Sequence, residues 1–120
     1  MRMVKVGAVQ MKCTRLVEES IARADKLVRK AAAEGAQIIL LPELFERQYF
    51  CQEKRYDYYD FATSPEENQA VIHFQKVAKK LSVVLPVSFY ERDANRLSNS
   101  VAILDPHGSN LGIYRNRHIP

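Results

Sequence analysis

The chain has 120 residues, with 18 lysine and arginine residues against 14 aspartate and glutamate residues, a net charge of +4. Apolar residues make up 47% and charged residues 27%, which is typical of a soluble globular chain and excludes disorder as the main state. The longest apolar runs, at 38–42 and 83–87, are far shorter than the ~20 residues of a membrane-spanning helix.

Residues 4–11 alternate between two faces that both carry apolar side chains, a pattern that favours an interior strand. From about 16 to 33 apolar residues recur at three- and four-residue steps, which predicts a helix, and Gly35 directly after it is a typical helix stop. The short apolar run at 37–41 predicts a buried strand parallel to the first, because a helix connects the two. The first forty residues therefore predict a right-handed strand–helix–strand unit.

The segment 42–63 is irregular and rich in aromatic residues, which indicates either a loop with a functional role or a flap packed on a core edge or subunit interface. Ser64, Pro65 and Glu67 carry the signals of a helix start, so we expect a helix from 64 to about 82 with Ser64 as its cap. Strands expected at 83–90, 97–104 and from 110 onward are separated by tight turns and predict an antiparallel meander.

Glu43 comes directly after the second apolar run and Pro42. Functional sites of open α/β sheets lie at the carboxyl ends of strands. Apolar neighbours disfavour the charged form of a carboxylate, which would suit Glu43 to act as a general base near neutral pH. A glutamate after a strand also commonly tethers a loop, and the residues themselves leave both interpretations open.

Basic residues are spread among acidic ones along the chain, which is typical of solvated helix faces, so we expect no nucleic-acid partner and no membrane partner. Cys13 and Cys51 match neither a zinc-binding spacing nor a C-x-x-C motif. The first residues lack the uninterrupted apolar segment of a secretory signal. We therefore expect a cytoplasmic protein with both thiols reduced.

Four ordered motifs resemble those of the nitrilase, or carbon–nitrogen hydrolase, superfamily. They are the opening strand at 4–11, Leu-Pro-Glu-Leu-Phe-Glu with Tyr-Phe-Cys-Gln at 41–52, the strand at 84–91, and the segment 111–120 that ends in His-Ile-Pro. The resemblance covers the whole chain. It implies an α/β fold in which residues 1–120 are the N-terminal part of one carbon–nitrogen hydrolase domain. That part belongs to a four-layer αββα sandwich, with a mixed sheet and two helices on one face.

The resemblance implies hydrolysis by a Glu–Lys–Cys set with no metal or organic cofactor. The glutamate takes the cysteine proton, the thiolate attacks the carbonyl carbon of an amide or ureido group, and the lysine ammonium stabilises the oxyanion. Ammonia leaves, and water then hydrolyses the acyl-enzyme. From an N-carbamoyl amine the end products are the amine, carbon dioxide and ammonia, a reaction that belongs to polyamine biosynthesis.

Within this resemblance Glu43 matches the general base, and Asn116 stands at the expected lysine position. Asparagine can donate a hydrogen bond but carries no charge, and losing a charged oxyanion stabiliser costs on the order of 10²-fold in rate or more. Arg115 and Arg117 flank this position, but neighbouring residues of a strand point to opposite faces, so neither is expected to replace the lysine.

Tyr49 and Phe50 are expected to line the substrate pocket. The resemblance implies that the nucleophilic cysteine is not in this chain but on a later strand. Cys51 belongs to the Tyr-Phe-Cys motif, and Cys13 lies outside every catalytic motif, so we expect packing roles for both. The 120-residue chain by itself is therefore expected to be inactive.

Two functional interpretations follow from the resemblance. The expected ligand is a small-molecule amide or ureido substrate in the first and a protein partner in the second. In the first, the chain is part of an enzyme of this family. In the second, it is a non-catalytic, truncated family member that serves in binding or assembly, as a homo-oligomer or with a complementary family fragment. An unrelated small α/β binding domain is the third possibility, which the four ordered motifs disfavour.

Overall fold

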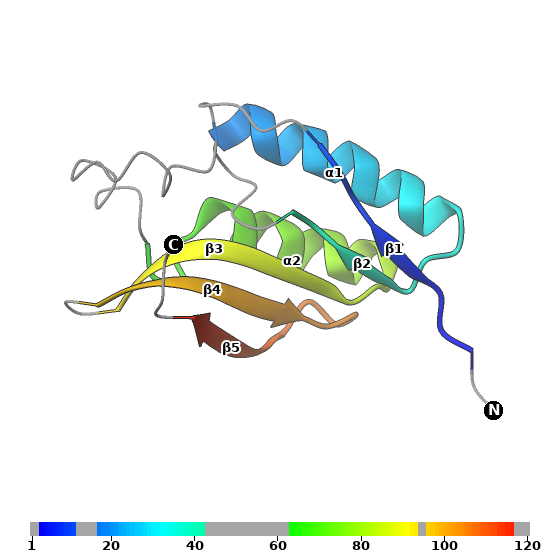
Figure 1. Cartoon of the computed structure of the whole chain (residues 1–120). Coiled ribbons are helices and arrows are strands. Elements are labelled where there is room, and N and C mark those ends of the chain that lie inside the picture. Colours follow the sequence, from blue (N-terminus) through cyan, green and yellow to red (C-terminus); the bar gives the residue numbers. More distant parts are fainter. Residues whose placement is uncertain (1–2, 12–16, 43–62, 94–95, 117–120) are drawn as a thin grey trace.

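A computed structural model describes residues 3–11, 17–42, 63–93 and 96–116 (Figure 1). Glu43, Tyr49, Phe50, Arg117 and both cysteines lie outside the described residues. The described residues form two helices and five strands, which are, in chain order, β1 (Val6–Ala8), α1 (Val17–Ala33), β2 (Ile38–Leu40), α2 (Gln69–Leu81), β3 (Leu85–Asp93), β4 (Arg96–Leu104) and β5 (Asn110–Asn116).

The strands form a mixed arrangement. Strands β1 and β2 are parallel, with Val6 opposite Ile38, whereas β3, β4 and β5 form an antiparallel meander in that order. A parallel bridge between Ile38 and Val84 connects the two groups. There the Ile39 amide donates to the Val84 carbonyl at 3.0 Å. The expected parallel strand pair and the expected meander are both confirmed.

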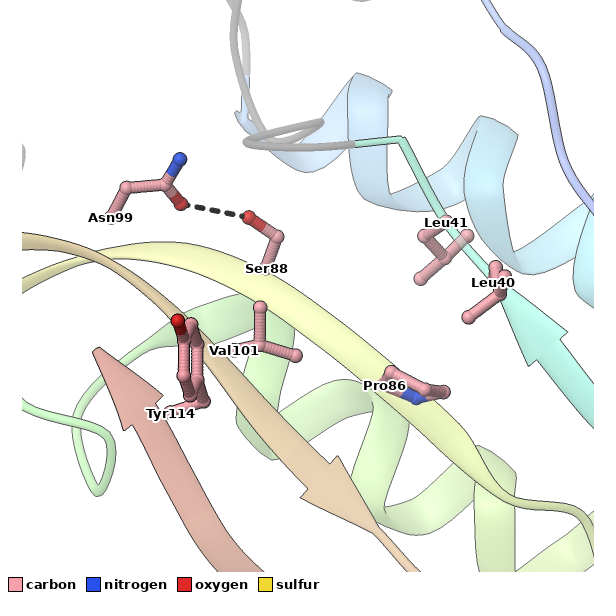
Figure 2. Close-up of a pocket in the computed structure, with 7 residues that line it drawn as sticks. All are labelled: Leu40, Leu41, Pro86, Ser88, Asn99, Val101 and Tyr114. Carbon is pink, nitrogen blue, oxygen red and sulfur yellow. Dashed lines mark hydrogen bonds between the residues drawn. The ribbon is translucent and has the colours of Figure 1, made fainter. Parts of the chain in front are cut away.

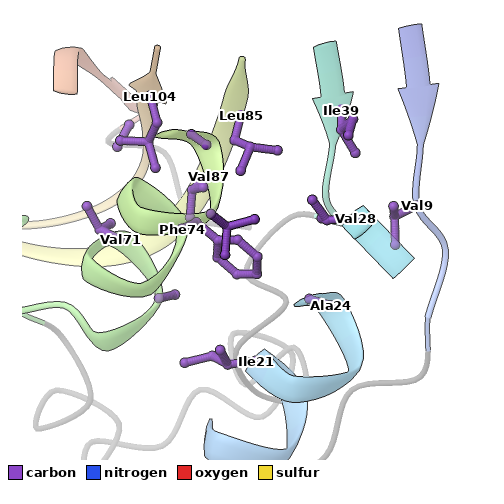
Figure 3. Packing of buried hydrophobic residues seen from close by; sticks show 14 of the residues in the cluster. Val9, Ile21, Ala24, Val28, Ile39, Val71, Phe74, Leu85, Val87 and Leu104 are labelled. Atoms are coloured by element: carbon purple, nitrogen blue, oxygen red, sulfur yellow. The ribbon is translucent and has the colours of Figure 1, made fainter. Parts of the chain in front are cut away.

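Both helices lie on the same side of the strands (Figure 1). On β3 the alternate residues Leu85, Val87 and Phe89 are completely buried, in one apolar cluster with Phe74 of α2. Figure 3 shows Leu85 and Val87 beside Phe74. Val28 of α1 belongs to the same apolar cluster. Burying a side chain of this size contributes about 2 kcal/mol, so this shared core holds the helices against one face of the sheet.

Helix α2 begins later than its sequence signals predict. Its N-cap is Asn68, whose Oδ1 accepts a hydrogen bond from the Val71 amide at 3.0 Å. The prediction that Ser64 caps the helix is therefore wrong: the Glu67 amide bonds to the Ser64 carbonyl at 3.2 Å in a separate turn. Asparagine caps as well as serine, and Asn68 is buried and also donates to the Thr63 hydroxyl, which favours the later start.

Strand β1 does not lie in the interior of a sheet in the described part of the chain, where it pairs with β2 only. The Val6 side chain of β1 is 57% exposed. The opposite face is closed, because a Cβ atom on Gly7 would lie 3.3 Å from the Ala36 Cβ and 3.4 Å from the Ala31 Cβ. Among the described residues β1 thus has one covered face and one neighbouring strand, so the prediction of an interior strand is not confirmed.

Neither helix of the described part has the length and apolar composition that a membrane span requires.

Helices α1 and α2 are joined by a charged contact at their surface. Asp25 Oδ1 accepts from Arg29 Nε at 2.5 Å, and Asp25 Oδ2 lies 2.5 Å from His73 Nε2. Burial by itself would raise the pKa of Asp25, but the hydrogen bonds from Arg29 and His73, together with their charges, outweigh it and hold the pKa below its usual value of 3.8.

This contact makes a prediction about Asp25→Asn. A carboxylate whose pKa is lower in the folded state stabilises the fold above its unfolded pKa and loses that effect as the pH falls through the folded value. We expect Asp25→Asn to reduce the free energy of unfolding by about 1 kcal/mol near neutral pH. The difference from the wild type should vanish as the pH falls below 3.8.

Urea denaturation across that pH range measures the effect. The control is Glu19→Gln, which removes the exposed ion pair of Glu19 with Arg23 and should have little effect at any pH. A difference between wild type and Asp25→Asn that persists unchanged at the acidic end would contradict the role of this carboxylate.

Candidate functional site

The sheet face opposite the helices is hollowed. A cavity of about 340 Å³ opens there, a size within the range of small-molecule pockets. It is lined by residues of four strand regions, namely Leu40, Leu41, Pro86, Ser88, Asn99, Val101 and Tyr114 (Figure 2). Because successive strand residues point to opposite faces, the burial of Leu85, Val87 and Phe89 under α2 is what turns Pro86 and Ser88 toward this cavity.

One side of the cavity is polar. Ser88 Oγ donates to Asn99 Oδ1 at 3.2 Å, between adjacent strands β3 and β4 (Figure 2). Leucine, proline and valine side chains line most of the rest, and Tyr114 stands 71% exposed on β5. An apolar cavity with a hydroxyl and an amide on one side suits a small ligand that combines an apolar stem with a neutral polar group.

The cavity also touches the end of β2 that leads to the predicted base. Leu40 and Leu41 line it, and Pro42 and Glu43 follow them directly in the sequence. Glu43, Tyr49 and Phe50 lie outside the described residues, so their assignments stay predictions. The described residues resume at Thr63, whose amide donates to the Tyr90 carbonyl of β3 at 3.1 Å.

Position 116 lies on the cavity face of β5. In the register of β4 and β5, Val101 is opposite Tyr114 and Asn99 is opposite Asn116. Residues directly opposite in a sheet share a face, so Asn116 belongs to the face that carries Asn99 and Tyr114. Tyr114 lines the cavity, whereas the role expected for position 116 stays a prediction.

Arg115 lies on the helix face, opposite Ser100. Its Nε donates to Glu91 Oε1 at 2.6 Å and its Nη2 to Glu91 Oε2 at 3.0 Å, while Ser100 Oγ donates to Glu91 Oε1 at 2.9 Å. The Glu91 side chain is 1% exposed. The guanidinium is therefore bound on the far side of the sheet, and Arg115 cannot supply the positive charge that Asn116 lacks.

Sequence reasoning missed Ser88, Asn99 and the Glu91–Arg115 pair. A signal for the first two was present, because each interrupts an apolar strand on the side opposite its core residues. What placed them together was the register of β3 against β4, which a single strand does not reveal. Among the described residues, no three histidine, cysteine, aspartate or glutamate side chains gather into a possible metal site.

The sequence model of the carbon–nitrogen hydrolase family matches residues 5–120. The chain therefore belongs to the carbon–nitrogen hydrolase family. It is 50% identical over 117 residues to the N-carbamoylputrescine amidase of Oryza sativa subsp. japonica, a match that covers 98% of this chain and 39% of the relative. It is 40% identical over 117 residues to the citrullinase of Francisella tularensis, covering 98% of this chain and 41% of that relative.

Solved structures agree with the family. A carbon–nitrogen hydrolase from Helicobacter pylori G27 matches with a TM-score of 0.87 and 27% identity, over 98% of this chain and 40% of that chain. Nit3 of Saccharomyces cerevisiae, a member of the nitrilase superfamily, matches in fold with a TM-score of 0.79. The predicted α/β class, with a mixed sheet and two helices on one face, is confirmed. The chain spans about 40% of the length of the two sequence relatives.

Ser88 on the cavity face and Ser100 on the helix face make a matched pair of predictions. Ser100→Ala should reduce the free energy of unfolding by about 2 kcal/mol, because its hydroxyl donates to a buried carboxylate. Ser88→Ala should reduce it by about 1 kcal/mol, since its partner is a neutral amide oxygen. Chemical denaturation of both variants measures the two losses in the free energy of unfolding. A larger loss for Ser88→Ala would contradict the assignment of the charged hydrogen bond to Ser100.

Proposed function

We propose that this chain forms part of an enzyme that hydrolyses an N-carbamoyl amine of the N-carbamoylputrescine type and releases ammonia and carbon dioxide. The observation that carries the proposal is the 50% identity to an N-carbamoylputrescine amidase over nearly the whole chain. The cavity supports it, because a hydroxyl and an amide on one side suit a neutral ureido group and the apolar walls suit an alkyl stem.

In this proposal Glu43 is the general base. It follows Leu40 and Leu41, which line the cavity at the end of β2. The base takes the proton of a nucleophilic cysteine, and the thiolate attacks the ureido carbonyl carbon to give a tetrahedral oxyanion. Collapse of that intermediate expels ammonia, which takes the proton held by Glu43. Water activated by Glu43 then cleaves the carbamoyl thioester, which frees the cysteine thiol and gives a carbamic acid that breaks down to the amine and carbon dioxide.

The cysteine comes from a part of the protein outside these 120 residues, as the resemblance to the longer relatives implies. Tyr49 and Phe50 are proposed as further walls of the substrate pocket. Asn116 is proposed to donate a neutral hydrogen bond at the position where the family resemblance expects a lysine. A neutral donor stabilises an oxyanion less than an ammonium does, so this substitution should reduce the rate on the order of 10²-fold.

Two observations favour a second function, a non-catalytic role in binding or assembly. The lysine position holds a neutral residue. The sheet face opposite the helices also leaves apolar side chains uncovered, among them Val6 at 57% and Tyr114 at 71% exposure. In this alternative the face would bind a second copy or a complementary family fragment. A cytoplasmic location and a place in polyamine biosynthesis belong to the first proposal.

Ammonia release from N-carbamoylputrescine, with citrulline as the competing ureido substrate, tests the enzymatic proposal. The 120-residue chain should release none. The protein read through the following coding sequence should turn over N-carbamoylputrescine, with Glu43→Gln abolishing activity and Asn116→Lys raising kcat on the order of 10²-fold. The control, Glu66→Gln, changes an exposed glutamate and should leave the rate unchanged.

Activity of the isolated chain that Glu43→Gln abolishes would contradict the proposed need for an external nucleophile. Unchanged activity of Glu43→Gln in the longer protein would contradict the base. Preference for citrulline would contradict the substrate. Size-exclusion chromatography of the same 120-residue preparation tests the alternative, which a stable, monodisperse monomer would contradict.

A further inference from the structure

Strand β5 carries two adjacent residues that belong to different faces. Arg115 shares the helix face with Ser100 and binds Glu91, whereas Asn116 shares the cavity face with Asn99. A slip of one residue along β4 would exchange the two, because side chains alternate with a period of two. Tyr114, which lines the cavity, would then turn to the helix face, and Arg115 would turn to the cavity face. Whatever sets the register of β5 therefore decides what the cavity contains.

Apolar packing fixes this register only weakly. Leu111 is 66% exposed and Tyr114 is 71% exposed, while Ile113 is half-buried. In the described part of the chain, β5 pairs with β4 alone, so it receives no alignment from a second neighbour. Strands with so little buried on either face are those whose pairing slips most easily.

The turn before β5 does not fix the register of its far end either. Leu104 is opposite Asn110 and Ala102 is opposite Ile113, so this interval holds one more residue on β5 than on β4. Such a bulge disrupts the ladder locally. The pairing of 113–116 therefore needs a contact beyond the bulge.

The Glu91–Arg115 pair supplies that contact. Both carboxylate oxygens of Glu91 accept from the guanidinium, at 2.6 Å and 3.0 Å, and Ser100 Oγ donates to one of them at 2.9 Å. The three residues come from β3, β5 and β4, so the contact spans the whole meander. A one-residue shift would break both hydrogen bonds between the Arg115 guanidinium and a carboxylate that is 1% exposed, so this two-point pair opposes the shift.

We propose that Glu91 and Arg115 are positioning residues that fix the register of β5 and so keep residue 116 on the cavity face. The inference rests on the proposed function for the role of residue 116 only. Its test needs no substrate, so its failure and the failure of the proposed function are distinguishable.

The decisive variant is Glu91→Gln/Arg115→Met, which removes both charges. Replacing a buried ion pair with neutral residues of similar volume commonly leaves the free energy of unfolding unchanged. This variant can therefore lose the register of β5 without losing overall stability. NMR of the labelled 120-residue chain should show loss of the cross-strand contacts between residues 99 and 116 and between 101 and 114. Amide exchange at 114 and 116 should speed up by roughly tenfold or more, while exchange at Phe74 and Val77 in α2 stays the same.

The matched control is Glu19→Gln/Arg23→Met, which removes an exposed ion pair on α1 and should change neither the contacts nor the exchange at 114 and 116. Wild-type contacts and exchange in Glu91→Gln/Arg115→Met would overturn the proposal. If that variant does not fold, Arg115→Lys provides the test, because lysine keeps the positive charge but cannot make the two-point hydrogen bond of the guanidinium. Faster exchange confined to 113–116 in Arg115→Lys supports the proposal, and wild-type exchange there overturns it.

Discussion

Helices α1 and α2 cover one face of the sheet only, and the structure depends on this constraint together with the alternation of strand residues. On β3, Leu85, Val87 and Phe89 are buried under α2, so the residues between them must face the other way. The core thereby selects which side chains remain for a site. The cavity at Pro86 and Ser88 is the consequence of burying their neighbours.

The same alternation gives adjacent polar residues separate roles. On β3, Ser88 faces the cavity and Glu91 faces the helix side, where burial makes its pairing with Arg115 strong. On β5, position 116 is assigned to the cavity face by one residue of register. In the proposed account, the cavity face is thus supported from the helix face, through hydrogen bonds that a ligand in the cavity would not contact.

Periodicity predicted most of the elements from the sequence, because three- and four-residue apolar spacing and alternation reflect burial directly. The start of α2 was misplaced since Asn68 and Ser64 are equally good caps, and only tertiary burial of Asn68 decides between them. The role of position 116 was inferred from the family resemblance and stays a prediction. Ser88 and Asn99 were not found, because their proximity depends on cross-strand register, a long-range property.

The central claim is that the helices close one face of the β3–β5 meander, whereas the other face leaves Tyr114 of β5 exposed beside the cavity, and cysteine labelling tests it most directly. Cys13 and Cys51 are first replaced by serine, and Tyr114→Cys or Ala102→Cys is then added, one residue on each face of neighbouring strands. With a maleimide under native conditions, Tyr114→Cys should react at the rate of a free thiol. Ala102→Cys, fully buried, should react slower on the order of 10²-fold or more. Equal rates at the two positions would contradict the two-faced arrangement on which the site depends.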